Sequence, residues 1–383
     1  MNHVFQSFSF ACVVYFTRSS VDERQRHRGI GVTPARAASI ITVNSTSDNI
    51  TIDGACTLRE AITNANADLD TTGGDCVAGS GNDTIVFHSS LGTATITLAS
   101  TLPDITDDAG LTIDGDNRIT LSGNDSVQVL RGWATLTLKN ISVTHGRAAD
   151  GGGLYYWGTV TIIHSTFSNN SATNGSGGGV ANVGGTATIT NSAFSNNSAT
   201  GDGGGVFNDG TLTIANSAFS NNSANAGGGV INNSGTATIL NSTFSGNSVT
   251  YNGGGVFTWN GGASPPTSTI RNTILANSAA GYDDCWNHAT GTLIGDHNII
   301  EMTSTCNSIA TLTSDPNLGS LAGSPAYFPL NAGSPAIDAG NDAICAGPPV
   351  NNDSQNGVTR PQGAHCDIGS FELVRIFLPL ILR

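Results

Sequence analysis

Apolar and polar residues alternate along much of this 383-residue chain. In Thr186–Asn191 and again in Thr211–Asn216, apolar residues fall at every second position. This period of two is that of a β-strand, whereas a helix would place apolar residues three or four positions apart. Gly, Asn and Ser separate these short runs, and such residues favour turns and left-handed backbone conformations. The pattern therefore predicts many short strands joined by tight turns.

One phrase recurs through the middle of the chain. Three glycines followed by Leu or Val begin at Gly151, Gly177, Gly203, Gly227 and Gly253, so the repeat is 24 to 26 residues long. A second phrase, Phe-Ser-Asn-Asn or Phe-Ser-Gly-Asn, lies at a nearly fixed place within the repeat and ends at Asn170, Asn197, Asn222 and Asn247. Self-similarity at such a period is typical of stacked repeats, in which each unit buries its apolar face against its neighbours.

Strands that repeat at this period predict an all-β fold, a parallel β-helix whose coils lie about 4.8 Å apart along the axis. Equivalent residues of successive coils then form columns. The expected interior columns are an aromatic one (Phe167, Phe194, Phe219, Phe244) and an aliphatic one (Ile162, Ile189, Ile214, Ile239). At a turn, we expect amide side chains of a third column to hydrogen-bond to their copies above and below. This column comprises Asn191, Asn216, Asn241 and Asn272.

The segment Cys56–Ala65 changes to a helical period, with four apolar residues on one helical face. Thr57 and Glu60 form a capping box, in which each side chain satisfies the backbone N–H of the other. An open β-helix exposes its core and its strand edges at each end. Because this helix comes just before the coils, we expect it to plug the N-terminal end.

The chain divides into five expected segments. These are a leader or signal region (1–38), an N-terminal cap (39–80), the β-helix repeats (81–310), C-terminal coils with a closing motif (311–373) and a short apolar tail (374–383). Val4–Phe16 is moderately apolar and Ala35–Ala38 resembles a signal-peptidase site, but charged residues crowd the stretch between them. We therefore expect export, with a start codon or reading frame that is doubtful upstream of about Gly31.

The tail 374–383 has an apolar run of seven residues that includes one proline. This run is too short to span a bilayer, and no other apolar run of the chain reaches the roughly 18 residues of a membrane-spanning helix. Two interpretations stay open, namely a cover over the last coil and an exposed signal for export or anchoring. We favour the signal, because Arg375 and Arg383 bracket the apolar run.

Three sets of motifs resemble known families. Cys56–Ala61, Cys-Thr-Leu-Arg-Glu-Ala, resembles the signature of the CSLREA domain with Thr57 in place of the usual Ser, which makes residues 39–80 a CSLREA-like cap. The Gly-Gly-Gly-Val and Phe-x-x-Asn phrases are similar to the repeats of polymorphic outer membrane proteins, which share the right-handed β-helix of pectin lyase-like proteins. Gly333–Gly340 and Arg360–Glu372 resemble the closing motif of the choice-of-anchor Q group. These resemblances imply a right-handed parallel β-helix and a secreted, surface-displayed bacterial protein, but no settled reaction.

The charge of the chain excludes some partners. Its formal net charge is −14, its single lysine is Lys139, and no Lys or Arg occurs between Arg147 and Arg271. A nucleic-acid groove needs clustered cations to neutralise phosphates, and an anionic lipid surface needs them as well. We therefore expect neither partner.

Six cysteines remain once Cys12 is assigned to the leader, and they fall into three pairs about one coil long: Cys56/Cys76, Cys285/Cys306 and Cys345/Cys366. A rigid stack keeps distant coils beyond the separation that a disulfide allows, so pairing within each pair is expected. A zinc site is disfavoured because the chain has no Cys-x-x-Cys spacing. Three bridges imply an oxidising compartment, in agreement with export.

A catalytic β-helix would need carboxylates that hold calcium beside an Arg or Lys base, or paired Asp residues for hydrolysis. The regular coils lack them, since Asp202 and Asp209 are the only carboxylates between Gly151 and Asn252. We therefore predict no catalytic residue and no metal site in the coils.

One alternative catalytic set remains, Arg271 with Asp283 and Asp284, although their neighbours favour a surface turn. Residues 78–85 approximate a calcium-binding nonapeptide, but such sites need adjacent copies. The first turn of the β-helix is the preferred interpretation of this stretch, and a structural calcium ion is the alternative. We expect no other cofactor.

An outward-facing row of residues suggests binding. If the Leu or Val after each glycine triplet points inward, the next residue points outward, which gives the row Tyr155, Ala181, Phe207, Ile231 and Phe257, with Trp157 and Trp259 nearby. Exposed aromatic residues on a flat sheet can stack on sugar rings or dock another protein. The alternative is that a loop covers this row. The candidate binding residues are Tyr155, Trp157, Phe207, Phe257 and Trp259.

Together these features predict an exported, monomeric β-helix protein, extracellular or associated with the bacterial cell surface or outer membrane. We predict a non-catalytic role, either structural and adhesive or in glycan binding, with an extracellular glycan or another surface protein as partner. The alternative is a polysaccharide-degrading enzyme, either a pectate lyase-like polysaccharide lyase or a glycoside hydrolase. A cleft lined by carboxylates and a cation would favour the enzyme, and a long face of polar and aromatic residues would favour the binding protein.

Overall fold

The computed structural model describes residues 37–262, 265–279 and 281–375, which fall in one compact unit. The expected leader with Cys12 and most of the apolar tail lie outside the described residues. Predictions about those two segments therefore stay predictions.

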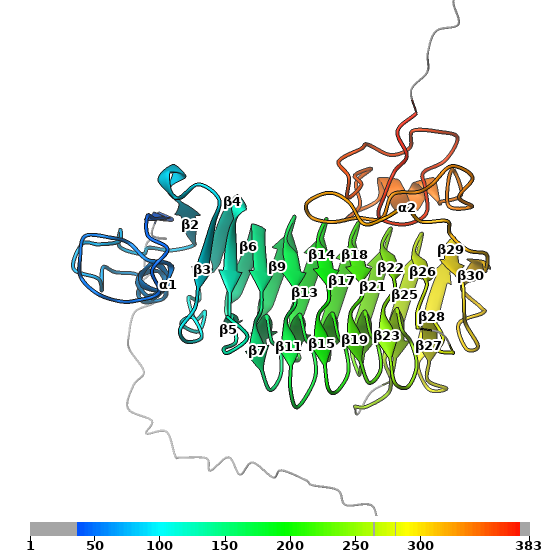
Figure 1. Cartoon of the computed structure of the whole chain (residues 1–383), viewed down its shortest axis with the longest axis horizontal. Helices are drawn as coiled ribbons and strands as arrows, with labels where there is room; N and C mark the ends of the chain where they lie inside the picture. Colours follow the sequence, from blue (N-terminus) through cyan, green and yellow to red (C-terminus); the bar gives the residue numbers. More distant parts are fainter. Residues whose placement is uncertain (1–36, 263–264, 280, 376–383) are drawn as a thin grey trace, which may run out of the picture. The chain divides into compact units, whose positions relative to one another are not determined.

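Three parallel sheets form the body of the protein (Figure 1). Sheet A has eighteen strands: β1 (Ile40–Val43), β2 (Asp83–Phe87), β3 (Ala94–Thr97), β4 (Leu111–Ser122), β6 (Thr135–Thr144), β9 (Thr159–Ile163), β10 (Thr166–Ser168), β13 (Thr186–Thr190), β14 (Ala193–Ser195), β17 (Thr211–Ala215), β18 (Ala218–Ser220), β21 (Thr236–Leu240), β22 (Thr243–Ser245), β25 (Thr267–Arg271), β26 (Ile274–Ala276), β28 (Thr292–Asp296), β29 (Asn298–Ile300) and β30 (Ala310–Leu312). Sheet B has seven: β5 (Leu130–Gly132), β8 (Leu154–Tyr156), β12 (Val180–Asn182), β16 (Val206–Asn208), β20 (Val230–Asn232), β24 (Val256–Thr258) and β27 (Cys285–Asn287). Sheet C has five: β7 (Arg147–Ala148), β11 (Ser171–Ala172), β15 (Ser198–Ala199), β19 (Ser223–Ala224) and β23 (Ser248–Val249). The helices are α1 (Leu58–Ala67), the short 3-10 helix η1 (Ser89–Leu91) and α2 (Asp342–Ala346).

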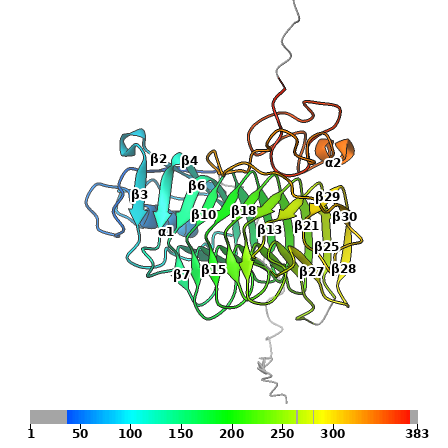
Figure 2. The same ribbon diagram turned by 45° about the vertical axis from the view of Figure 1, so that its right-hand side comes forward.

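Each regular coil visits the three sheets in turn, as Figure 2 shows from the side. One coil runs through β12 in sheet B, β13 and β14 in sheet A, and β15 in sheet C, and each strand pairs in parallel with its copy in the next coil. The pairing is like on like, so that Val180 lies beside Val206 and Phe194 beside Phe219. The predicted parallel β-helix with a short N-terminal helix is confirmed.

The predicted Phe column is confirmed as the centre of the core. Phe167, Phe194, Phe219 and Phe244 are fully buried. Successive rings are stacked, with centroids 5.1, 4.8 and 4.5 Å apart and planes within 9° of parallel. The predicted column of four isoleucines lies in register beside them, also without exposure. Together with the buried Leu and Val residues of sheet B, these columns form the main hydrophobic core.

The expected amide ladder of Asn191, Asn216, Asn241 and Asn272 was wrong for its first members. All four residues do lie at a turn, with φ between 44° and 50°. The side-chain oxygens of Asn191 and Asn216, however, have no hydrogen-bond partner among the described residues. In this row the backbone makes the contact between coils, for example from Asn191 N to Ala215 O at 3.1 Å. Asn is needed here because it tolerates the left-handed bend inside sheet A.

The amide ladder is formed instead by the last residue of the Phe-Ser-Asn-Asn phrase, in the column Asn170, Asn197, Asn222 and Asn247. Asn197 donates from Nδ2 to Asn222 Oδ1 and to Phe167 O, both at 2.9 Å. Its own Oδ1 accepts from the backbone N–H and the Nδ2 of Asn170. The buried side chain of Asn197 is thereby satisfied on both sides of its coil.

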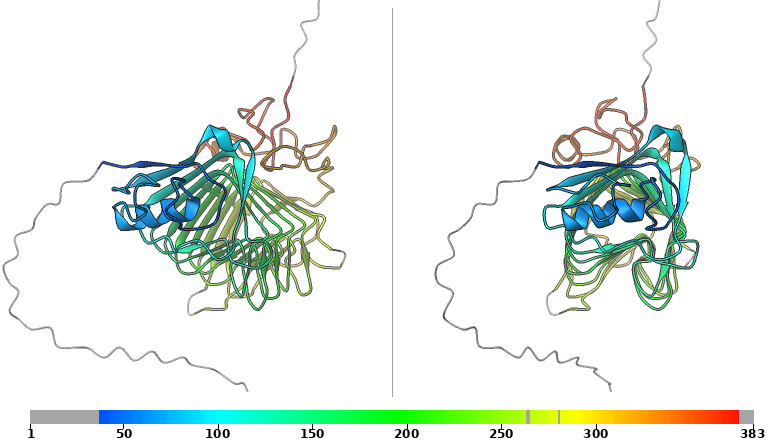
Figure 3. Two further views of the ribbon diagram at one scale, coloured as in Figure 1. Left: turned by 60° about the vertical axis from the view of Figure 1, so that its left-hand side comes forward. Right: turned by 90° about the vertical axis from the view of Figure 1, so that its left-hand side faces the viewer.

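Helix α1 lies at the N-terminal end of the stack, as predicted (Figure 3). The capping box of Thr57 and Glu60 is present, and the apolar face of the helix is buried in the main core. The disulfide Cys56–Cys76 ties the start of the helix to the loop that follows it. The helix therefore covers apolar surface that the first coil would otherwise expose.

After β30 the described chain adds no further strand to the three sheets, so the expected C-terminal coils in 311–373 are not formed. The segment 313–375 instead returns along sheet A, in orange and red in Figure 1. Gln355 Nε2 donates to Ser192 O at 3.1 Å, Ser370 N to Thr243 Oγ1 at 3.0 Å, and Gly369 N to Asn272 O at 2.8 Å. The outward-facing residues of β14, β18, β22 and β26 (Ala193, Ala218, Thr243, Ile274) are consequently buried.

A buried arginine holds this C-terminal segment together. The Arg360 guanidinium is 3.3 Å from a carboxylate oxygen of Glu372 and donates to the carbonyl oxygens of Asp353, Asp367 and Gly369. Burial lowers the pKa of Arg360 to about 10, so the side chain stays charged at neutral pH. The predicted bridges Cys285–Cys306 and Cys345–Cys366 are also present, which completes the three expected pairs.

The Phe column makes a first prediction. Phe219→Ala should lower the free energy of unfolding by about 3–5 kcal/mol, since it opens a cavity between the rings of two neighbouring coils. Thr211→Ala, an exposed change on the outer face of β17, should alter it by less than about 0.5 kcal/mol. Denaturant unfolding of both variants measures the difference. Equal stability of the two variants would contradict the proposed role of the column.

The amide ladder makes a second prediction. Asn222→Ala removes the acceptor of two buried Asn197 donors, which should destabilise the protein by about 2–6 kcal/mol at about 1–3 kcal/mol for each unpaired group. The matched control is Asn221→Gly, because Asn221 is exposed at φ 53° and Gly246 already occupies the equivalent position of the next coil. This control should remain within about 0.5 kcal/mol of wild type. Thermal unfolding measures the stability of both variants. Equal melting temperatures of Asn222→Ala and Asn221→Gly would show that the ladder does not stabilise the protein.

Candidate ligand-binding pockets

The outward row predicted from the glycine triplets is confirmed as a column on sheet B. Leu154 and the four valines at its equivalent positions are fully buried inside the coil. The next residues lie in register along the outer face and continue one coil further than expected: Tyr155, Ala181, Phe207, Ile231, Phe257 and Trp286. This column crosses six successive strands of sheet B.

Exposure differs along this column, so the predicted surface row needs correction. Ile231 and Phe257 are 0% and 2% exposed, although both point away from the coil interior. They are covered because Ala226, from the turn before the glycine triplet, packs on them together with the surrounding rings. Tyr155 and Phe207 are half-buried, and Trp157 is 41% exposed. The turn at Ala226 therefore covers Ile231 and Phe257. More ring surface is exposed on Trp157, which lies beside the row.

A cluster of aromatic rings lies at the C-terminal end of the column. Phe257 stacks on Trp286, with ring centroids 4.8 Å apart, and on Trp259 at 5.8 Å. Tyr251 lies 6.2 Å from both Phe257 and Trp286, and His288 lies edge-on to Trp259 at 4.6 Å. Sequence reasoning missed Trp286 because its coil has Cys285 where the others have Val and lacks the glycine triplet.

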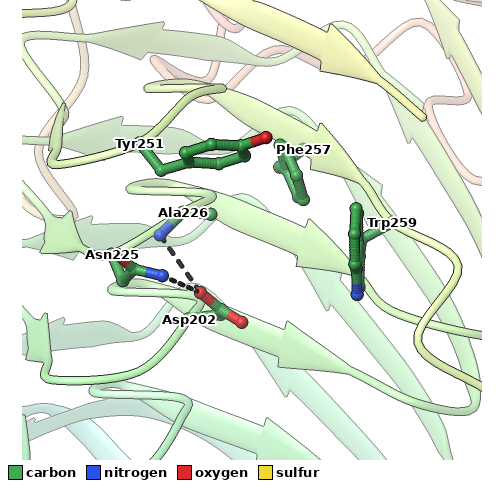
Figure 4. A pocket seen from close by; sticks show the side chains of 6 residues that line it. All are labelled: Asp202, Asn225, Ala226, Tyr251, Phe257 and Trp259. Atoms are coloured by element: carbon green, nitrogen blue, oxygen red, sulfur yellow. Dashed lines mark hydrogen bonds between the residues drawn. The ribbon is translucent and has the colours of Figure 1, made fainter. Parts of the chain in front are cut away.

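A pocket of about 290 Å³ opens beside this cluster (Figure 4). Its lining residues are Asp202, Asn225, Ala226, Tyr251, Phe257 and Trp259. One carboxylate oxygen of Asp202 accepts hydrogen bonds from Ala226 N at 3.1 Å and Asn225 Nδ2 at 3.4 Å. Burial raises the pKa of Asp202, more than these two hydrogen bonds lower it. The pocket thus combines ring faces with one partly desolvated carboxylate.

A second pocket, of about 320 Å³, lies at the N-terminal end of the same column. Tyr155 and Trp157 line it edge to face, with centroids 4.5 Å apart. Its polar residues are Gln128, Arg131 and Asp150. Arg131 makes an ion pair with Asp104 at 2.8 Å, so this pocket contains a neutralised cation that the first pocket lacks.

The two pockets lie on the same face of the stack but are built differently. Asp150 and Asp202 each precede a glycine triplet directly, but Tyr155 and Trp157 belong to the coil of Asp150, whereas Phe257 and Trp259 belong to a coil two further on than that of Asp202. Tyr155 and Phe257 are four coils apart, which corresponds to roughly 19 Å along the axis. One extended ligand lying along sheet B could therefore contact both pockets.

The alternative catalytic residues are not brought together. Arg271 ends β25 in sheet A and lies 3.6 Å from Asp296. Asp283 accepts from Ser304 N and Oγ, and Asp284 is fully buried in the turn before β27, where it accepts from Ser278 N and Met302 N. Each of the three side chains thus has a separate structural partner, and the arrangement provides no shared substrate position.

The stretch 78–85 leads into β2, which pairs with β1 on one side and β4 on the other, so it belongs to the first turns of the β-helix. Asp83 is buried at the start of β2 and accepts from Ser80 N and Ser39 N at 2.9–3.0 Å. Among the described residues, no group of three or more His, Cys, Asp or Glu is arranged to hold a metal ion. The described part of the chain also contains no helix that is both long and apolar enough to cross a membrane.

The three sheets and their stacked columns define a parallel β-helix protein. Within its regular coils, residues 191–209 and 241–258 match the model of the Chlamydia polymorphic membrane protein repeat. Among solved structures, the chain is similar to the one titled "Crystal structure of pectate lyase Pel9A", with a TM-score of 0.40 and 15% sequence identity over 87% of this chain and 96% of that chain. No curated protein matches it.

Asp284 makes a prediction about pH dependence. Burial raises the pKa of its carboxyl above the ordinary value of 3.8, so the folded state holds the proton more tightly than the unfolded chain. Its contribution to stability therefore falls as pH rises from the unfolded pKa through the folded pKa, and is constant above. Relative to Asp284→Asn, the wild type should lose stability between about pH 3 and neutral pH. Denaturant unfolding at several pH values measures this, and a pH-independent difference would contradict it.

Proposed function

We propose that this protein is a non-catalytic, exported β-helix protein that binds glycan chains along the outer face of sheet B. The observation that carries the proposal is the pair of aromatic pockets on the outer face of sheet B, whose ring residues Tyr155 and Phe257 are four coils apart. A polysaccharide is a repeating ligand, and a stack of equivalent coils offers repeating positions along its length.

The chemistry of the pockets suits sugar rings. The exposed ring of Trp157 and the half-buried ring of Trp259 can stack on the apolar faces of sugars. Gln128 Oε1 and the Asp150 carboxylate can accept hydrogen bonds from sugar hydroxyl groups, since Gln128 Nε2 already donates to the carbonyl oxygens of Asp150 and Gly151. Pockets that combine apolar rings with a few polar groups are typical of small-molecule recognition. The aromatic rings therefore provide contact area for a sugar, and the polar residues beside them can fix its orientation.

The charges in the two pockets favour neutral or cationic glycans over acidic ones. Asp150 and Asp202 are their carboxylates, while the cation Arg131 is already paired with Asp104. An acidic polysaccharide would meet uncompensated like charges here, which costs affinity. This argues against the alternative of a pectate lyase-like enzyme, as does the separation of Arg271 from Asp284. A glycoside hydrolase would need two carboxylates facing one bond, and the two aspartates line separate pockets.

Display outside the cell is part of the proposal. Three disulfides are expected of a protein that folds in an oxidising compartment. The CSLREA-like segment Cys56–Ala61 and the choice-of-anchor Q-like motifs of the C-terminal segment support surface display by resemblance, and the repeat match to Chlamydia polymorphic membrane proteins agrees with it. Docking of another surface protein on the same face is the alternative to glycan binding.

Binding can be tested with a panel of neutral, amino and acidic polysaccharides on the purified chain. Trp157→Ala and Trp259→Ala should each weaken binding of the preferred glycan about tenfold, the equivalent of about 1.4 kcal/mol of stacking. Thr186→Ala, on the outer face of sheet A, should bind like wild type. Calorimetry gives the affinities, and a reducing-end assay reports cleavage. Sugar release that rises with time, or binding indifferent to both tryptophans, would reject the proposal.

A further inference from the structure

We propose that the pocket lined by Asp202, Tyr251, Phe257 and Trp259 binds an organic ammonium group, such as the amino group of a glucosamine unit. The inference rests on the proposed glycan binding for the rest of the ligand, but it assigns a distinct chemistry to this pocket. The pocket at the C-terminal end of sheet B would then be selective for a cation.

The arrangement of the side chains is that of an open aromatic cage. In Figure 4, the rings of Tyr251, Phe257 and Trp259 surround one side of a space whose other side is the carboxylate of Asp202. The rings come from two segments, since Tyr251 lies in the turn before the last glycine triplet while Phe257 and Trp259 lie in and just after β24. Because Phe257 is stacked on Trp259 and on Trp286, a cation in this space would contact the rings of Tyr251 and Trp259 and the carboxylate together.

Ring faces attract cations because the π electrons give each face a partial negative charge. The attraction is stronger where water is partly excluded. Phe257, which is 2% exposed, forms the back of the pocket, and the ring of Tyr251, which is 50% exposed, is open to a ligand. Stacking of Phe257 on Trp259 and Trp286 fixes its orientation without a ligand. The cage is therefore largely formed before anything binds.

The carboxylate of Asp202 lacks a positive partner. Ala226 N and Asn225 Nδ2 both donate to the same oxygen, and no ion pair of Asp202 occurs within the described residues. No Lys or Arg occurs between Arg147 and Arg271, and the chain as a whole carries −14. Burial raises the pKa of this carboxyl, which reflects the cost of leaving its charge uncompensated. A bound ammonium group would reduce that cost.

The other pocket provides an internal comparison. It has a carboxylate at the equivalent place, Asp150, but Arg131 also lines it. A positive ligand there would meet a cation that is already present. We therefore expect the preference for an ammonium group in the C-terminal pocket only. At about 290 Å³ the C-terminal pocket is close to the lower end of ligand pockets, about 300 Å³, which agrees with recognition of one unit of a longer chain.

The test measures affinity of the full chain for three probes by calorimetry: a glucosamine tetramer, its N-acetylated form and choline. Wild type should bind the glucosamine tetramer at least tenfold more tightly than the N-acetylated tetramer, and added salt should reduce that ratio. Asp202→Asn should bring the ratio close to one. The matched control is Asp209→Asn, in the turn between β16 and β17 of the same coil and outside the pocket, and it should keep the wild-type ratio.

The outcomes separate this inference from the proposed function. Tight binding of choline with no binding of either tetramer would support the ammonium pocket and reject glycan binding. Equal binding of both tetramers, unaltered by Asp202→Asn, would overturn the ammonium pocket and leave glycan binding standing. Because Asp202 holds a turn, thermal unfolding of Asp202→Asn is measured first. Trp259→Leu, which leaves that turn intact, should also lower the ratio, and an unchanged ratio in this variant would count against the cage.

Discussion

The buried amides of the Asn column are satisfied largely through the same residue of the next coil. The amide of Asn197 bonds to Asn222 on one side and Asn170 on the other, and the Phe rings beside it are stacked in the same register. The spacing of about 4.8 Å between parallel strands admits a copy of the same side chain and little else. This constraint explains why the Phe-Ser-Asn-Asn phrase is repeated so closely and why one altered copy affects two neighbouring coils.

The outer face of sheet B is free of that constraint, and there the coils differ from one another. The inward position is Leu or Val in five successive coils, whereas the outward position changes from Tyr155 to Ala181, Phe207, Ile231 and Phe257. The residue before each glycine triplet changes in the same way, with aspartate in only some coils. The stack thus separates a uniform interior, which holds the fold, from a variable outer column, which forms the two pockets.

The features that sequence predicted are those governed by local or periodic rules. The Phe column follows from the repeat, helix α1 from its capping box, and the disulfides from pairs about one coil apart. The amide ladder was assigned to the wrong Asn column because a sequence does not show which Asn points inward and which adopts a left-handed bend. Trp286 and the burial of Phe257 depend on contacts between a turn and a strand, and the return of the C-terminal segment depends on contacts far apart in sequence.

The C-terminal segment has a consequence for the order in which the protein is made. Gln355 bonds to a coil 163 residues earlier, and Asn341 to one 69 residues earlier. Since synthesis delivers the N-terminus first, helix α1 is available before any regular coil exists. The cover over β14, β18, β22 and β26 is delivered last. Until then the outer face of these four strands is uncovered. During that interval the incomplete β-helix can associate with other chains through this face.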